Sequence, residues 1–439
     1  LWAMKRLPVD AFPDVTNVQI QILSQAPGMA PTEVEKLVTF PIEITMAGLP
    51  RLDQVRSLSK IGLSVITVAF QDGVDIYFAR QQVFERLQQA KESLPKGIEP
   101  QMGPITTGLG EIFQYIIEGP GRDLTEIRAI QDWIIRPLLR TVPGVADINS
   151  FGGKVKQYEV VIDPDKLKGF DLTIRDVYEA VESNNVTAGA GYIDHRDEQY
   201  MVRGLGLAKS AEDLKEIVIT SRGGTPIHVH DVAEVTVGSE PRQGATTYDG
   251  KGEAVAGIVM MLKGASGKEV VAGVKRKVEA IQKSLPEGVK LVPYYDRTAL
   301  VEKVIETVRA NLLEGGLLVV LILFYFLGNV RGGLIVALVI PLSMLFSFLG
   351  MHWAGLSANL MTLGAIDFGM IVDGSVVMVE NTVRHLSEPR KGGGPLIQSI
   401  YLSAKEVARP IMFGVAIIII VYLPIVTLTG MEGKMFAPM

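Results

Sequence analysis

The chain has 439 residues, more than one compact domain usually holds, and 48% of them are apolar. It carries a net charge of −5 without a block of basic residues, and it contains no cysteine. These values exclude a disordered or collagen-like chain, a disulfide framework, a cysteine-ligated metal site and a thiol nucleophile. They also give no reason to expect a nucleic-acid partner.

Residues 1–12 are expected to be the end of a first membrane helix, and residues 13–300 alternate between strand-like and helix-like stretches. The first of these stretches are predicted, in chain order, as a strand, a helix, a hairpin, a helix and a strand at Val18–Leu23, Thr32–Gly48, Ser57–Phe70, Asp75–Ser93 and Ile112–Glu118.

A helix-to-strand joint occurs twice in this part of the chain. Ser93–Ile98 reads Ser-Leu-Pro-Lys-Gly-Ile, and Ser284–Val289 reads Ser-Leu-Pro-Glu-Gly-Val. The repeat predicts two α+β units of the split βαβ, ferredoxin-like kind. The predicted first unit is 13–118, and the second consists of 119–163 with 240–300. A small α+β domain, 164–239, is predicted to be inserted into the second unit.

Charged residues become rare after this part. Residues 311–439 contain 14 of them, whereas the first 310 residues contain 77. Because a helix needs ~20 apolar residues to cross a bilayer, segment 301–439 predicts an α-helical membrane bundle. Its four helices are expected at about 312–328, 333–351, 360–380 and 410–430.

The basic residues predict the orientation of these helices. Lys and Arg follow the third helix and Arg331 precedes the second, whereas the turn His352–Asn359 has neither residue type. Positive loops face the cytoplasm, so residues 1 to about 305 are expected outside. Because the chain starts within one apolar helix and stops just after another, we expect it to be part of a longer protein.

Three carboxylates, Asp367, Asp373 and Glu380, fall in or beside the third predicted membrane helix. Each charge near the bilayer centre costs ~3 kcal/mol or more, so the pattern predicts a proton relay or an ion path. For Glu380 the alternative is a side chain that marks the cytoplasmic helix end. A protease dyad is disfavoured, because six residues rise ~9 Å along a helix and such a dyad shares a proton at about 3 Å.

The segment Ala365–Asn381 contains Asp-Phe-Gly, Val-Asp-Gly and Val-Glu-Asn in that order. Together with Leu7–Asp14, Gly103–Glu111 and Gly430–Phe436, it resembles the heavy-metal efflux branch of the resistance–nodulation–division superfamily. Two aspartates and a glutamate resemble its zinc/cobalt/cadmium group. The resemblance covers essentially the whole chain and corresponds to the first of two tandem halves.

This resemblance implies a multi-pass pump of a Gram-negative inner membrane. It implies a homotrimer in the lipid bilayer, joined to a periplasmic adaptor (membrane fusion) protein and an outer-membrane channel. The two α+β units would be periplasmic porter subdomains 1 and 2, and 164–239 would be a docking insert.

Two further carboxylates, Glu111 and Asp147, border apolar strand-like runs. Carboxylates bind zinc less tightly than thiolates do, which suits a metal that must be released. The resemblance implies that both line the metal site of the porter domain, from two different subdomains. The alternative is that both are solvated edge residues. His228 and His230 have the spacing of one strand face, and we expect a surface strand of the insert rather than metal ligands.

The sequence thus predicts proton-driven export of a divalent heavy-metal cation, Zn²⁺ first, with Co²⁺, Cd²⁺ and Ni²⁺ left open. The chain would be a secondary active transporter, a cation/proton antiporter and not an enzyme, with no permanently bound cofactor. It contains no phosphate-binding loop that would indicate ATP as the energy source. Two alternatives stay open: a drug or organic-solute pump, and a proton-driven accessory of protein export.

Overall fold

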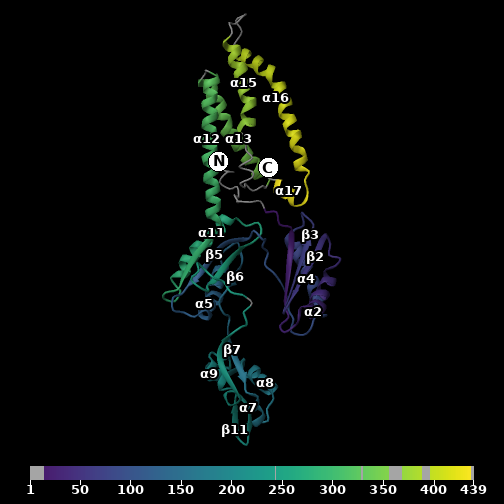
Figure 1. Cartoon of the computed structure of the whole chain (residues 1–439), viewed down its shortest axis with the longest axis vertical. Helices are drawn as coiled ribbons and strands as arrows, with labels where there is room; N and C mark the ends of the chain where they lie inside the picture. Colours follow the sequence, from purple (N-terminus) through teal and green to yellow (C-terminus); the bar gives the residue numbers. More distant parts are fainter. Residues whose placement is uncertain (1–13, 243, 328–329, 355–367, 388–395, 437–439) are drawn as a thin grey trace.

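A computed structural model describes residues 14–242, 244–327, 330–354, 368–387 and 396–436. Long helices occupy one end of the molecule, two α+β units lie in the middle, and the insert forms the other end (Figure 1).

The first unit is a four-stranded antiparallel sheet with helices. Its strands, in the order β2-β3-β1-β4, are β1 (Val18–Gln25), β2 (Leu52–Lys60), β3 (Leu63–Phe70) and β4 (Pro100–Met102). Its helical segments are α2 (Pro31–Val34), the π-helical turn η1 (Glu35–Thr39), α3 (Phe40–Met46) and α4 (Ile76–Lys91). Asp75 caps α4 by accepting a hydrogen bond from the backbone of Phe78. Alternating residues such as Ile22 and Ile66 form the core with Val38 of the helical layer.

The second unit has the same strand arrangement. Its sheet, β14-β5-β13-β6, contains β5 (Glu111–Glu118), β6 (Val145–Phe151), β13 (Val255–Met261) and β14 (Lys290–Asp296). Its helical segments are α5 (Leu124–Ile130), η2 (Gln131–Ile135), α6 (Arg136–Arg140) and α11 (Gly267–Gln282). In both units the first and third strands in chain order are central, and the second and fourth are at the edges.

The repeated joint has one structure in both units. Gly97 and Gly288 have φ angles of 89° and 85°, a backbone region that glycine enters without a steric cost. Each glycine turns the chain from the long helix, α4 or α11, into the last strand of its sheet. The repeat seen in the sequence is therefore a repeat of turn geometry.

One strand belongs to a different unit from the one predicted. The division at residue 118 placed Ile112–Glu118 in the first unit, whereas β5 pairs with β13 and β14 of the second. β5 is a central strand whose Phe113 and Tyr115 are fully buried there. The chain therefore changes units in the loop after β4.

The insert leaves and returns through one two-stranded ladder. Strands β7 (Lys156–Ile162) and β12 (Ala233–Ser239) pair from Lys156↔Ser239 to Ile162↔Ala233, so its ends are neighbours. The other elements are α7 (Pro164–Gly169), α8 (Ile174–Asn184), β8 (Thr187–His195), β9 (Glu198–Leu205), α9 (Ala211–Lys215), β10 (Val218–Arg222), β11 (Thr225–His228) and α10 (Val229–Val232). Leu167, Val177, Leu214 and Val229 belong to its own small core.

The remaining elements are helices: α12 (Arg297–Leu327), α13 (Val330–Trp353), α15 (Phe368–Ser387), α16 (Leu396–Val426) and α17 (Gly430–Phe436). Among the described helices, two stretches, Val330–Trp353 and Leu396–Ile425, are long and apolar enough to cross a membrane. The helix predicted at 410–430 instead begins at Leu396 and continues through Pro410. Residues 360–367 of the third predicted helix, and the helix end at 1–12, lie outside the described residues.

Candidate metal-binding site

Glu111 and Asp147 lie in one row across the second sheet. Both are register partners of Met260, Glu111 from β5 and Asp147 from β6. Residues directly paired across antiparallel strands point to the same side of the sheet. Val259 and Ile148 pack in the core with the helices, and successive side chains alternate between faces. The row therefore lies on the sheet face away from the helices.

Two irregularities shape this row. The β13–β5 ladder shifts register between Val259 and Met260, and the β13–β6 ladder shifts between Met260 and Met261. Bulges re-aim side chains and are frequent next to functional sites. The sulfur of Met260 accepts a hydrogen bond from Asn149 at 3.0 Å, whereas Met261 is buried.

Asp147 is held by a cation of its own unit. Arg136 at the start of α6 places Nη2 3.2 Å from each carboxylate oxygen, and the backbone N–H of Ile148 donates to Oδ1 at 2.8 Å. The Asp147 side chain is 18% exposed. Arg136 therefore supplies the partner that a half-buried carboxylate needs, and a metal ion at Asp147 would have to displace it.

Glu111 is more open. It is an exposed residue whose Oε2 accepts a hydrogen bond from Gln114 at 3.1 Å. Partial burial, together with the negative charge of Glu111, raises the pKa of Tyr294 on β14 above its usual value. The Glu111 carboxylate thus lies near a phenol and an amide, and it forms no ion pair with another described residue.

An ion shared by the two carboxylates would have to bridge the strand that lies between them. Two strand spacings place their Cα atoms about 10 Å apart, and both side chains point to the same face. To share a zinc ion, both side chains would have to lean over Met260 until their oxygens lie at the ~2.0–2.2 Å at which zinc binds carboxylates. The prediction that they come from two subdomains is wrong, because both strands belong to one sheet. A shared ion would therefore not report closure between the units.

The loop before Glu111 is tied to the first long helix. Arg297, the first residue of α12, is 7% exposed and donates from Nη1 to the backbone oxygen of Leu109. A Cβ on Gly110 would meet the hydroxyl of Thr106 and would lie 2.9 Å from the backbone oxygen of Thr107, so this turn favours glycine. Sequence reasoning missed both Arg136 and Arg297, because neither lies near its partner along the chain.

The predicted relay residues are only partly within the described residues. Asp373 and Glu380 lie on α15, which contacts both α13 and α16. Their side chains are exposed in this chain, and within its described part neither forms a hydrogen bond or an ion pair. A Cβ on Gly374 would lie 3.1 Å from Ile411, so α15 and α16 approach closely beside Asp373. Asp367 lies outside the described residues.

A polar cluster joins α15 and α16 one turn beyond Glu380. Buried Asn381 donates to the backbone oxygen of Ser403 at 2.9 Å and to the carboxylate of Glu406 at 3.3 Å. His385 Nε2 lies 2.9 Å from the same carboxylate. The cluster fixes how these two helices pack beside Glu380. Sequence reasoning missed Glu406. Ser403 and Glu406 are three residues apart and lie on one helix face, and this spacing could have indicated a polar cluster.

Comparison with known proteins identifies the family to which the chain belongs. Residues 1–439 match the AcrB/AcrD/AcrF family over their full extent. The chain belongs to this family, which is part of the resistance–nodulation–division superfamily. The predicted superfamily is thereby confirmed.

Similar members of the AcrB/AcrD/AcrF family carry the names of metal resistance proteins. The cobalt-zinc-cadmium resistance protein CzcA of Cupriavidus metallidurans is 51% identical over 454 residues, and the nickel and cobalt resistance protein CnrA of the same species is 45% identical over 477. A crystal structure of a heavy metal efflux pump superposes with a TM-score of 0.91 at 38% identity. All of this chain is covered in each case, but only 43%, 44% and 43% of these proteins.

Proposed function

We propose that the full-length protein exports divalent heavy-metal cations, zinc first, with cobalt, cadmium and nickel in the same substrate class. The observation that carries this proposal is 51% identity over the whole chain to a protein named for cobalt, zinc and cadmium resistance. The row of Glu111 and Asp147 supports it, because it offers oxygen ligands of the kind that bind divalent cations. In this proposal the full-length protein is a transporter and not an enzyme.

In this proposal Glu111 and Asp147 bind the metal transiently. Open Glu111 takes the hydrated cation first, and Asp147 joins when Arg136 swings away. Arg136 then competes with the departing ion for Asp147, so the site releases metal and does not store it. The remaining ligands would be water or residues of the longer protein.

Protons drive the export in this proposal. Asp367, Asp373 and Glu380 take up and release protons in turn along the membrane helix that carries them, because carboxylates inside a bilayer are costly and mark proton or ion paths. The protein would thus be a cation/proton antiporter of a Gram-negative inner membrane.

The assembly proposed for the protein is a homotrimer with a periplasmic adaptor and an outer-membrane channel. The insert supports this arrangement, since it is a separate α+β module at the end of the molecule away from the long helices (Figure 1). Such a module is free to contact neighbouring subunits.

A resistance assay with the full-length protein tests the function. Cells that carry the Glu111→Gln/Asp147→Asn variant should lose growth on zinc, because both proposed oxygen ligands lose their charge. The matched control is Glu118→Gln, an exposed glutamate at the other end of the same strand, which should leave growth unchanged. Wild-type zinc resistance in the double variant would refute the proposed metal site. A wild-type protein that confers resistance to organic solutes but to no metal would refute metal export itself.

A further inference from the structure

A second group of metal-ligand residues lies in the insert, far from the row of Glu111 and Asp147 along the chain. Glu216, which follows α9, and His228 and His230 each offer one ligand atom, and these atoms lie within 4.8 Å of one another. No other group of three or more such residues occurs among the described residues. The proposed export site does not use any of the three.

The two histidines do not share a strand, contrary to the sequence-based expectation. β11 ends at His228, and His230 lies on the short helix α10 that follows. Asp231 turns the chain here, because its Oδ2 accepts a hydrogen bond from the backbone N–H of His228 at 2.8 Å. The turn brings the rings face to face, with centroids 5.1 Å apart and planes 16° from parallel.

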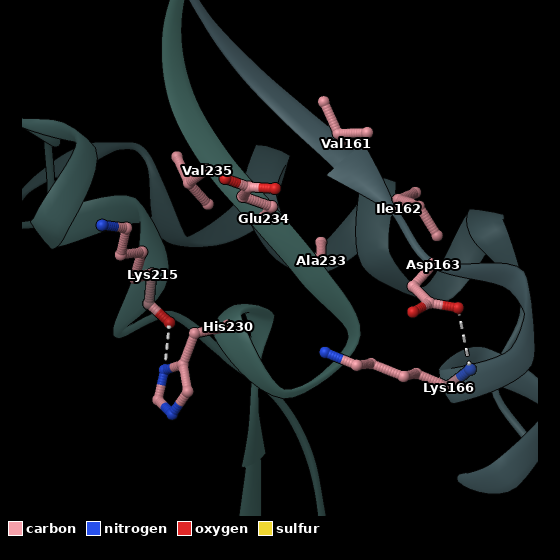
Figure 2. A pocket seen from close by; sticks show the side chains of 9 residues that line it. All are labelled: Val161, Ile162, Asp163, Lys166, Lys215, His230, Ala233, Glu234 and Val235. Atoms are coloured by element: carbon pink, nitrogen blue, oxygen red, sulfur yellow. Dashed lines mark hydrogen bonds between the residues drawn. The ribbon is translucent and has the colours of Figure 1, made fainter.

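Backbone carbonyls select the ring nitrogen that is left for a metal. His228 Nδ1 lies 2.9 Å from the oxygen of Glu216, and His230 Nδ1 lies 3.0 Å from the oxygen of Lys215. Figure 2 shows the second of these bonds. A carbonyl oxygen only accepts, so Nδ1 donates its proton in both rings. In the neutral rings the lone pair is therefore on Nε2. Metal-binding histidines are commonly oriented in this way, by a hydrogen bond from their other ring nitrogen.

Negative charge surrounds the pair. Oε1 of Glu216 lies 3.9 Å from His230 Nδ1, and Oδ1 of Asp231 lies 3.5 Å from His230 Nε2. The Asp231 oxygen near Nε2 is not the one that caps α10. A cation placed between the rings and Glu216 would therefore meet one carboxylate and two neutral nitrogens, with the Asp231 carboxylate beside His230.

Space is available on one side of the group. A cavity of ≈580 Å³ lies between β7, β12 and α9, and the charged residues in its wall beside His230 are Asp163 and Glu234 together with Lys166 and Lys215 (Figure 2). Neither His228 nor Glu216 lines it. A hydrated cation would thus approach from the side of His230.

We propose that Glu216, His228 and His230 bind one divalent transition-metal ion, with Zn²⁺ preferred and Co²⁺ and Ni²⁺ in the same class. Two imidazoles and one carboxylate are a known zinc ligand set that leaves the fourth position to water. Ligand atoms around a tetrahedral zinc ion lie about 3.4 Å apart, given bonds of ~2.1 Å. The group therefore has to close by at most about 1.4 Å, which the exposed side chains of Glu216 and His230 permit. This site goes beyond the proposed export function and does not depend on it.

Zinc titration of the purified full-length protein, carrying a tag without histidine, tests the proposal. The titration starts from the Glu111→Gln/Asp147→Asn variant. This variant lacks the proposed export ligands, so the zinc ions that it still binds occupy another site. In that background, His228→Gln/His230→Gln should remove one bound Zn²⁺ per protomer. His195→Gln, which changes an exposed histidine at the end of β8 in the same insert, should not change the number of bound ions.

Two further measurements keep the test decisive if the double histidine variant folds poorly. Glu216→Gln alters only an exposed carboxylate and should weaken zinc binding at least ten-fold. X-ray absorption of the zinc-loaded Glu111→Gln/Asp147→Asn protein should show scattering from two imidazole ligands. An unchanged number and affinity of bound ions in His228→Gln/His230→Gln, or a spectrum with oxygen ligands only, would overturn the site. Neither result would bear on metal export through Glu111 and Asp147.

Discussion

Asp147 has one cationic partner in this structure, Arg136, and would need to exchange it for a metal ion. The pair is only partly buried, with side chains 38% and 18% exposed. Ion pairs with this degree of solvent contact contribute about 0.2–1 kcal/mol. The exchange would therefore cost little energy, and in the proposed metal site Arg136 would lower the affinity for the ion without preventing its binding.

Replacing this arginine should strengthen metal binding. In Arg136→Gln the ion no longer competes with a guanidinium, so zinc affinity should rise by up to about five-fold, as the energy of such a pair allows. Isothermal titration of the full-length protein measures this change, with the more distant Arg140→Gln of the same helix as the control. A fall in affinity would show that Arg136 supports the site and does not compete for it.

Asp373 is one of the two predicted relay residues, with Glu380, that the structure describes. Asp373→Asn should reduce proton-coupled zinc flux at least ten-fold while the protein still assembles, because the variant removes a titrating group and keeps the side-chain volume. The flux is measured in inverted vesicles with an imposed pH gradient and an enclosed zinc dye. Glu432→Gln, an exposed carboxylate of α17, serves as the control. Wild-type coupled flux in Asp373→Asn would end the relay hypothesis.

At the scale of elements, a buried polar network holds the second sheet to its helices. The hydroxyl of Tyr115 on β5 donates to Gln131 in η2 at 2.9 Å, and Gln131 donates to Ser150 on β6 at 3.2 Å. Burial raises the pKa of Tyr115 well above its usual value, so the hydroxyl keeps its proton. A Cβ on Gly257 of β13 would lie 2.3 Å from the Tyr115 ring, so the ring lies against this glycine.

Removing this hydroxyl should destabilise the second unit. Tyr115→Phe leaves the buried Gln131 oxygen without its donor, which costs about 1–3 kcal/mol. The midpoint of thermal unfolding should fall, by roughly 4–8 °C per kcal/mol if the unit unfolds on its own. Tyr77→Phe, at a tyrosine that is 63% exposed, should leave the midpoint unchanged. Equal midpoints for both variants would contradict the role of the network.

At the scale of the whole molecule, the chain enters the insert through β7 and leaves it through β12, and these two strands pair with each other. Ile162 and Ala233 are register partners, and the backbone N–H of Asp163 donates to the oxygen of Val232 at 2.9 Å. The module closes on itself around its own core. It should therefore be removable without disturbing the sheet that carries Glu111 and Asp147.

A deletion of the insert tests this separation. Replacing residues 163–232 by Asn-Gly in the full-length protein joins β7 and β12 through the two-residue turn that hairpins favour. Zinc binding at Glu111 and Asp147 should persist, whereas the proposed trimer should weaken, because the module proposed to contact neighbouring subunits is gone. Native mass spectrometry measures the trimer fraction. An unchanged fraction would remove the docking role from the insert.

The sequence by itself determined the features that depend on neighbouring residues. The repeated joint at Ser93 and Ser284 predicted two units of one kind, since a turn requires its glycine within a few residues of the preceding helix. The composition after residue 310 predicted the long helices but not all of their ends, because α12 already begins at Arg297, α15 continues to Ser387 and α16 begins at Leu396 and continues through Pro410. Asp367 lies outside the described residues, and the relay role of Asp367, Asp373 and Glu380 stays a prediction.

Tertiary structure decided which strands and side chains meet. The sheet to which β5 belongs depends on pairing with β13 and β14, more than 130 residues further along the chain, and no local signal carries that register. The same pairing puts Glu111 and Asp147 on either side of Met260. A turn at Asp231 likewise stacks two histidines that the sequence had placed on one face of a surface strand. Turn and helix preferences depend on a few adjacent residues, whereas strand register and ion pairing depend on contacts that form only when the whole chain buries its core.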